Sequence, residues 1–204
     1  MTSCVDEFLA RAESCVGGTV TRLAVVAYPV LADDDRRWIE RARALYDPQA
    51  SRIAAHFTLV FPTEAAEVDV LAHTRGVVAS NEPMAVVLRR AVAFPDPMSG
   101  GAFVCLLADD GGRELRVLHE TLYDGVLATH RRRDAPFRPH VTIGADARLD
   151  GCERIAGELN AERRIMNARI ETIDVIEVGD AVVRTVAQLR LGLGAPRGKG
   201  DSGW

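Results

Sequence analysis

The amino-acid sequence predicts an α+β protein in which two helix-covered sheets, antiparallel or mixed, face each other across a central cleft. Short apolar runs rich in β-formers alternate with amphipathic stretches of helical period. The order strand, helix, strand, helix, strand occurs twice, on either side of the turn-rich segment PDPMSGG at residues 95–101. The two halves do not align residue by residue, so the repeat lies in element order alone. We therefore expect two pseudo-symmetric lobes.

The first half begins with a near-continuous β-prone run at residues 22–31. An amphipathic helix is expected at residues 32–47, with Asp33 or Asp34 as its N-cap. Apolar residues at helical spacing predict its buried face, namely Trp38, Ala42 and Leu45. The half continues with a strand at 56–62, a helix at 63–80 with Val68, Leu71, Ala72 and Val78 on its apolar side, and a strand at 83–94.

The second half repeats this order and ends with one additional strand. Its expected elements are a strand at 102–109, a helix at 112–127 that buries Leu115, Leu118, Leu122 and Val126, a strand at 139–144, a helix at 149–163 that buries Cys152, Ile155 and Leu159, and a hairpin of residues 168–178 and 183–192 around GDA.

The domain organisation follows from these elements. We expect one bilobed domain at residues 21–192, with lobes at about 21–95 and 101–192 and with an exchange of strands between the lobes left open. Residues 1–20 are expected to form an N-terminal arm. The tail at 193–204 is rich in glycine and charge, and we expect it to be disordered.

Composition and charge limit the classes of function. With 204 residues, 48% of them hydrophobic and 26% charged, the chain has an ordinary globular balance. No apolar run approaches the roughly 20 residues that cross a bilayer, and the N-terminus lacks the pattern of a secretory signal. We therefore expect a cytoplasmic monomer with no membrane partner. The net charge of −4 argues against binding of long duplex nucleic acid, which requires many phosphates to be neutralised.

The cysteines indicate neither a metal site nor a disulfide framework. They are Cys4, Cys15, Cys105 and Cys152, and they include no C-x-x-C pair. Reduced thiols are the simpler interpretation, and Cys105 lies in an apolar run typical of the core. We expect no cofactor and no metal.

The triplet His-x-Thr is the most informative feature, because it occurs in two predicted strands. HFTLVFP contains His56 and Thr58, and RPHVTIG contains His140 and Thr142. Side chains at i and i+2 of a strand point to the same face, so an imidazole and a hydroxyl are neighbours in each strand. A third triplet starts at His119 in a predicted helix, where i and i+2 diverge, and we interpret it as a coincidence. The remaining histidines are expected at surface or helix-flank positions, namely His73, His119 and His130.

Two such pairs suit phosphodiester chemistry if the strands meet. Cleavage of a phosphodiester needs a base to activate a hydroxyl or water and an acid to protonate the leaving oxygen, and two histidines can fill these roles near neutral pH. Threonine hydroxyls can donate hydrogen bonds to the non-bridging phosphate oxygens. Structural histidines and β-forming threonines are the alternative interpretation.

The paired motifs and the element order of residues 22–192 resemble the two-histidine phosphoesterase superfamily, which includes 2′-5′ RNA ligase-like proteins and RNA 2′,3′-cyclic phosphodiesterases. The resemblance implies a metal-independent enzyme that opens 2′,3′-cyclic phosphates, or cleaves and reversibly joins 2′-5′ linkages, in RNA ends or small nucleotides. It implies that His56 is the proton donor and His140 the acceptor, and that Thr58 and Thr142 hold the phosphate.

Three further features concern the substrate. Many relatives carry an arginine shortly after the second motif; residues 144–146 here are Gly-Ala-Asp, so Arg138 is the candidate that supplies the charge. Tyr28 could stack on a base, although packing is the alternative for it, as we expect for Trp38 and Phe137. The basic loop HRRRDAPFRPH lies at the expected cleft mouth, where an arginine could contact phosphates.

Two other functions compete with this one. A nucleotide-binding regulatory module without turnover would keep the same cleft, but binding alone does not require two titratable groups. A metal-dependent hydrolase is disfavoured because no His, Asp and Glu cluster with ligand spacing accompanies either motif.

Overall fold

The computed structural model describes residues 22–96, 100–132, 136–179 and 182–192, and the expected arm and tail lie outside these ranges. The elements, in chain order, are β1 (Arg22–Ala27), β2 (Val30–Leu31), α2 (Asp33–Tyr46), β3 (Phe57–Thr63), α3 (Glu67–Ala79), β4 (Met84–Pro95), β5 (Ala102–Asp110), α4 (Gly112–Leu122), the 3-10 helix η1 (Gly125–His130), β6 (His140–Asp146), α5 (Leu149–Ala161), β7 (Met166–Ile170), β8 (Thr172–Val178) and β9 (Val183–Arg190).

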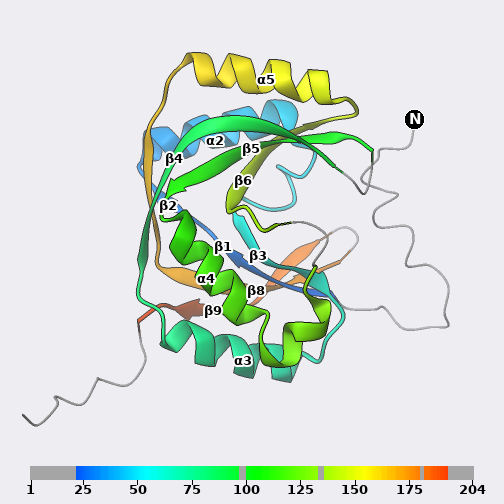
Figure 1. The fold of residues 1–204 in the computed structure, drawn as a ribbon, viewed down its shortest axis with the longest axis vertical. Coiled ribbons are helices and arrows are strands. Elements are labelled where there is room, and N and C mark those ends of the chain that lie inside the picture. The colour runs from blue at the N-terminus through cyan, green and yellow to red at the C-terminus, as the bar shows by residue number, and fades with distance from the viewer. Residues whose placement is uncertain (1–21, 97–99, 133–135, 180–181, 193–204) are drawn as a thin grey trace, which may run out of the picture.

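The strands of the described ranges form one curled antiparallel sheet in the order β2-β7-β4-β5-β6-β3-β1-β8-β9 (Figure 1). The α+β fold class is therefore confirmed. We expected two sheets, and hydrogen bonding joins them into one through the pair of Phe57 with Val141, the single registered pair between β3 and β6. We call β2, β7, β4, β5 and β6 the β4 half-sheet, and β3, β1, β8 and β9 the β1 half-sheet.

Each half-sheet takes strands from both halves of the sequence. In addition, two runs that we predicted as single strands are bent, and each contributes one strand to each half-sheet. Residues 22–31 divide at Tyr28 and Pro29 into β1, which pairs with β3 and β8, and β2, which pairs with β7. Proline has no N–H for the ladder, which favours a break at this point. The run at 168–178 divides at Glu171 into β7 and β8 in the same way.

The helices lie against different parts of the sheet. In Figure 1, α2 and α5 lie at one end of the molecule and α3 lies at the other. Helix α5 packs against β4 and β5, α2 packs against β6, and α4 packs against β3. No helix in the described ranges has both the length and the apolar character needed to span a bilayer.

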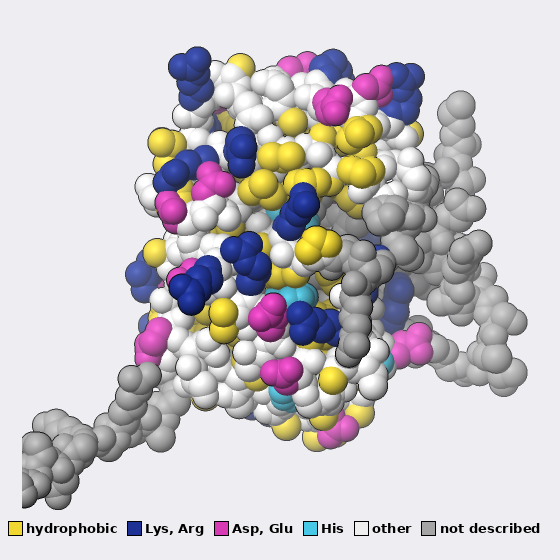
Figure 2. All heavy atoms as spheres, viewed as in Figure 1, with side chains coloured by type: hydrophobic (Ala, Val, Ile, Leu, Met, Phe, Trp, Pro, Cys, Tyr) yellow, Lys and Arg dark blue, Asp and Glu magenta, His cyan; other side chains and the backbone are white. Residues whose placement is uncertain are grey.

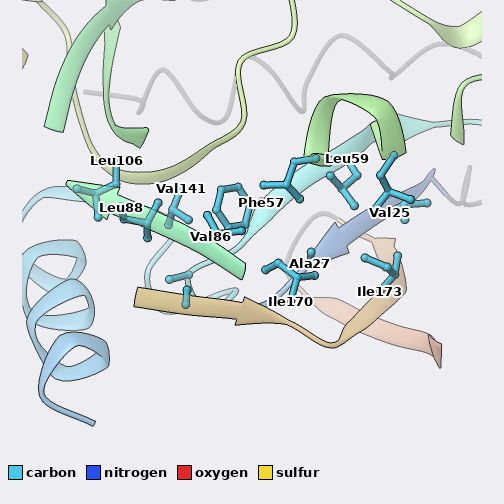
Figure 3. Close-up of a cluster of buried hydrophobic side chains, with 14 of the residues drawn as sticks. Val25, Ala27, Phe57, Leu59, Val86, Leu88, Leu106, Val141, Ile170 and Ile173 are labelled. Carbon is cyan, nitrogen blue, oxygen red and sulfur yellow. The ribbon is translucent and has the colours of Figure 1, made fainter. Parts of the chain in front are cut away.

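Most buried side chains of the two half-sheets meet in one large cluster, part of which Figure 3 shows. Phe57 and Leu59 of β3 and Val141 of β6 are fully buried in it. Because strand side chains alternate, Thr58 and Thr142 point to the opposite face, and both are half-buried. The core therefore fixes the orientation of the two His-x-Thr strands.

Three helical faces differ from the expected ones. Helix α2 begins at Asp33 after Ala32, without a side-chain cap, and Leu45 is 75% exposed. Its buried residues are Trp38, Ile39, Ala42 and Arg43. Val68 of α3 is exposed, whereas Thr74 and Val77 are buried. Helix α4 buries the three expected leucines but ends at Leu122, and Val126 lies exposed in η1. The expected α5 face is confirmed for Cys152 and Ile155.

Candidate active site

The two His-x-Thr motifs lie side by side where β3 meets β6. His56 directly precedes β3, and His140 is the first residue of β6. The antiparallel register about Phe57 and Val141 sets His56 opposite Thr142 and Thr58 opposite His140. All four side chains lie on the face opposite the buried core residues. The structure therefore brings together the four residues that the sequence singled out.

Both imidazoles are held in the same way. The Nδ1 atom of His56 is 2.9 Å from the carbonyl oxygen of Ala54, and the Nδ1 atom of His140 is 2.6 Å from the carbonyl oxygen of Arg138. A carbonyl oxygen can only accept, so Nδ1–H is the donor in both rings. The neutral tautomer then leaves the Nε2 lone pair of each ring available as a base, and the protonated ring presents Nε2–H as an acid.

The surroundings lower the pKa of both imidazoles. Burial is the main cause at His56, and the positive charges of Arg43 and of His140 lower its pKa further, against the Ala54 carbonyl and Asp47, which raise it. Burial also lowers the pKa of His140, partly offset by the Arg138 carbonyl. The action of the His140 charge on His56 reflects their proximity. Both rings favour the neutral form at neutral pH.

Of the two expected additional substrate contacts, Tyr28 lies beside the histidines. Its ring centroid is 6.1 Å from that of His56, in an edge-on arrangement. Burial raises the pKa of the phenol, as does the nearby carboxylate of Asp174. Tyr28 sits at the bend that follows β1, so the bend itself brings this ring to the site.

Arg138 is exposed and contacts the site mainly through its backbone. Its carbonyl oxygen is the acceptor for His140, while its guanidinium carbon lies 4.9 Å from the ring centroid of Phe94. The arginine thus forms a cation–π contact with Phe94, which lies on β4. The side chain is thus directed over β4.

Comparison with known sequences decides the family. A sequence model of the 2′-5′ RNA ligase superfamily matches residues 31–181, well over half of the chain. The chain belongs to the 2′-5′ RNA ligase superfamily. The resemblance that the paired motifs indicated is confirmed, and membership of the superfamily supports an enzyme that acts on phosphoesters of RNA or nucleotides.

The comparisons found one similar protein sequence and several solved structures that share the fold of this superfamily member. "Putative phosphoesterase OB1230" of Oceanobacillus iheyensis is 29% identical over 124 residues, which is 59% of this chain and 69% of that protein. LigT of E. coli, solved with 3′-AMP, superposes with a TM-score of 0.55 at 17% identity, covering 84% of this chain and 98% of LigT. Usb1 of Kluyveromyces marxianus has a TM-score of 0.54 at 11% identity, with 83% and 98% covered. At such identities these structures establish the fold.

The chain of this superfamily member also holds a buried arginine that sequence reasoning missed. Arg43 of α2 is 1% exposed. Its Nε donates to Asp47 at 2.8 Å and its Nη2 donates to the carbonyl of Ile53 at 2.7 Å. Glu40, a second ion-pair partner, accepts from the Ala55 backbone N–H at 3.1 Å. This network fixes the loop that leads from α2 to His56. The i, i+3 and i+4 spacing of these residues signals ion pairs, but it does not reveal their burial.

Thr142 has a buried partner in β5. Cys105 pairs directly with Thr142 in the sheet, and its thiol forms a hydrogen bond with the threonine hydroxyl. Burial raises the pKa of this thiol to about 12, so it stays protonated. Cys105 is therefore a core residue, as expected, that also orients Thr142.

His119 is not at the surface, contrary to expectation. It is 6% exposed, its Nδ1 is 2.7 Å from the carbonyl oxygen of Leu59, and its ring stacks on Phe137 at 3.7 Å. Nearby, the hydroxyl of Tyr123 accepts from the Phe61 N–H at 2.9 Å. His119 of α4 and Tyr123, which directly follows this helix, thus bind backbone groups of β3 beyond its pairing with β6. The spacing of residues on a helix cannot predict the burial of His119, because that burial depends on where β3 and β6 separate.

The titratable residues do not form a metal site in the described part of the chain. No group of three His, Cys, Asp or Glu side chains is close enough to hold a metal ion there. The polar side chains that the structure brings together at the candidate site are two imidazoles, two hydroxyls and the Tyr28 phenol.

Proposed function

We propose that this protein is a metal-independent phosphodiesterase that opens 2′,3′-cyclic phosphates, or cleaves and reversibly joins 2′-5′ linkages, in RNA ends or small nucleotides. The observation that carries the proposal is the pairing of β3 with β6, which sets two imidazoles and two hydroxyls on one face. Family membership and the matching Nδ1 contacts of the two rings support it.

In the proposed reaction, one Nε2 atom accepts a proton and the other donates one. Neutral His140 takes a proton from a water molecule, whose oxygen attacks phosphorus. Protonated His56 gives its Nε2 proton to the 2′ or 3′ oxygen as the bond from that oxygen to phosphorus breaks. Thr58 and Thr142 donate hydrogen bonds to the non-bridging oxygens, on which negative charge accumulates. Joining of a 2′-5′ linkage follows the same steps, with the 5′ hydroxyl of a second ribose in place of water and the 3′ oxygen of the cyclic phosphate as the leaving group. Cleavage of that linkage is the reverse, in which the 3′ hydroxyl attacks phosphorus and the 5′ hydroxyl leaves.

The test combines substrate range, metal removal and substitution. The protein is incubated with EDTA and with 2′,3′-cyclic nucleotides, 2′-5′ dinucleotides or cyclic dinucleotides. We expect EDTA-resistant turnover, and a loss of about 10²–10⁴-fold in kcat for either His56→Ala or His140→Ala, the range typical of general acid or base catalysis. His130→Ala, which changes a histidine of η1 away from both motifs, is the matched control.

The other outcomes discriminate the competing functions. Binding of nucleotides without turnover would instead indicate a regulatory module. Turnover abolished by EDTA would indicate a metal-dependent hydrolase and contradict the proposal.

A further inference from the structure

A concave region outside the candidate active site plays no part in the proposed reaction. It is a pocket of about 600 Å³ lined by Arg116, His119 and Glu120 of α4, by Arg131 and Arg132 after η1, and by Pro136 and Phe137. The stacked rings of His119 and Phe137 form part of its wall. An open pocket lined largely by charged side chains suits a polar ligand.

The pocket is positively charged although the chain is acidic overall. Three guanidinium groups and one carboxylate line it, whereas the whole chain carries a net charge of −4. Glu120 is an ion-pair partner of Arg131 at 3.6 Å. The guanidinium group of Arg116 forms no hydrogen bond or ion pair within the described part of the chain. Figure 2 shows arginine side chains around histidine atoms near the middle of one face, with an acidic side chain beside them. Guanidinium groups match phosphate oxygens in geometry and charge.

The pocket is joined to both His-x-Thr strands. Phe137 precedes His140 by three residues, which span at most about 10 Å of extended chain. His119 is bound to the carbonyl of Leu59, the residue after Thr58. These two connections place the pocket near both motifs, and its charge suits an adjacent nucleotide of an RNA strand that is bound at the two threonines.

We propose that this pocket, which we call the arginine pocket, binds the phosphate of a flanking nucleotide, so that the substrate is the end of an oligoribonucleotide and not a mononucleotide. The inference rests on the proposed function and specifies its substrate class. Arg116 and Arg131 hold the flanking phosphate, and the partly exposed Phe137 ring supports a neighbouring base by stacking.

The test compares two substrates that share one reacting group. One is a nucleoside 2′,3′-cyclic phosphate, and the other is a tetraribonucleotide that ends in the same cyclic phosphate. We expect the wild-type protein to have the higher kcat/KM on the tetranucleotide. Arg116→Gln should lower that value roughly five- to tenfold and leave the mononucleotide unchanged, because the substitution removes a charge-assisted hydrogen bond to the flanking phosphate. The matched control is Arg113→Gln, an exposed arginine of the same helix outside the pocket.

A binding measurement separates this inference from the proposed function. Fluorescence anisotropy with a labelled tetraribonucleotide 3′-phosphate should show weaker binding by Arg116→Gln, and a salt dependence shallower by roughly 0.7 in log Kd per log salt for each phosphate that is no longer neutralised. If the wild-type protein turns over neither substrate but still binds the tetranucleotide more tightly than Arg116→Gln does, the proposed function is wrong and the arginine pocket is supported as a phosphate-binding site. Equal effects of Arg116→Gln and Arg113→Gln, or equal losses on both substrates, would overturn the inference.

Discussion

At the scale of single residues, matching backbone contacts orient the two histidine rings. Each Nδ1 is bound to the carbonyl two residues earlier in the chain, Ala54 for His56 and Arg138 for His140. The two rings therefore present the same atom, Nε2, toward the shared face. Sequence cannot assign the acid and the base from this symmetry, so their roles remain those that the family resemblance implies.

The lowered pKa of each ring predicts an acid-shifted pH profile. Burial stabilises the neutral imidazole, so both pKa values lie below the ordinary 6.5. The active form needs one ring protonated and the other neutral, and its population is largest between the two macroscopic pKa values. We expect kcat/KM, which reports the free enzyme, to reach its maximum below pH 6.5 and to fall as pH rises through neutrality.

The profile is measured as initial rates from pH 4.5 to 9 at constant ionic strength. Binding of the phosphate anion favours the protonated rings, so kcat should retain activity to a higher pH than kcat/KM does. A kcat/KM that stays flat between about pH 7 and 8 is incompatible with the two-imidazole mechanism described above.

At the same scale, the four residues that meet at the candidate site could be predicted from the sequence, and the residues that hold them in place could not. His56, Thr58, His140 and Thr142 were found because a repeated triplet fell in two strands. Cys105 was recognised only as a core residue, because its contact with Thr142 depends on the register of β5 with β6. Long-range register is not encoded in any local pattern.

At the scale of elements, α2 and the loop after it form one unit around Arg43. The guanidinium of Arg43 and the side chain of Asp47 are almost fully buried, at 2% and 5% exposure. Removal of the cation leaves the carboxylate buried without its charge partner. We expect Arg43→Met to lower the free energy of unfolding by about 3 kcal/mol, as for other broken buried ion pairs, and to reduce turnover because the loop before His56 loosens.

Urea denaturation measures this effect, with Arg36→Met as the control. Arg36 pairs with Asp33 on the exposed side of the same helix, and its loss should cost less than about 1 kcal/mol. The double variant Arg43→Met with Asp47→Asn should regain part of the stability. Similar midpoints for the two single variants would show that the Arg43 network does not stabilise the loop.

The elements themselves were largely predictable, and their bends and faces were less so. Apolar runs and helical periods located the strands and helices. The bends at Tyr28 and at Glu171 were missed because β-prone residues continue on both sides of them. The buried face of α2 differs from the predicted one, because it includes Ile39 and Arg43 and leaves Leu45 in solvent. Pairing with the following loop directs the arginine inward. Tertiary contacts decided these points.

At the scale of the whole molecule, the sheet connects distant parts of the chain. We propose that residues 21–192 form one domain that folds as a unit. Neither half of the sequence contains a complete half-sheet: β1 and β3 need β8 and β9, and β4 needs β5 and β7. Expressed alone, segments 21–95 and 101–192 should therefore lack a cooperative unfolding transition, because each would leave apolar strand faces and edges uncovered.

Circular dichroism during thermal unfolding checks this expectation, with segment 21–192 as the control. That segment should show a single sigmoidal transition. A sigmoidal transition in either half alone would show that the lobes are independent domains.

The seam between β3 and β6 has a mechanical consequence. One registered residue pair joins the two half-sheets there, and the proton donor and acceptor proposed above stand on opposite sides of it. A phosphate bound by both threonines would connect the two half-sheets across that seam. Occupancy by a product nucleotide should therefore stiffen the whole protein, raising its melting temperature by an amount that vanishes when either threonine is replaced by valine.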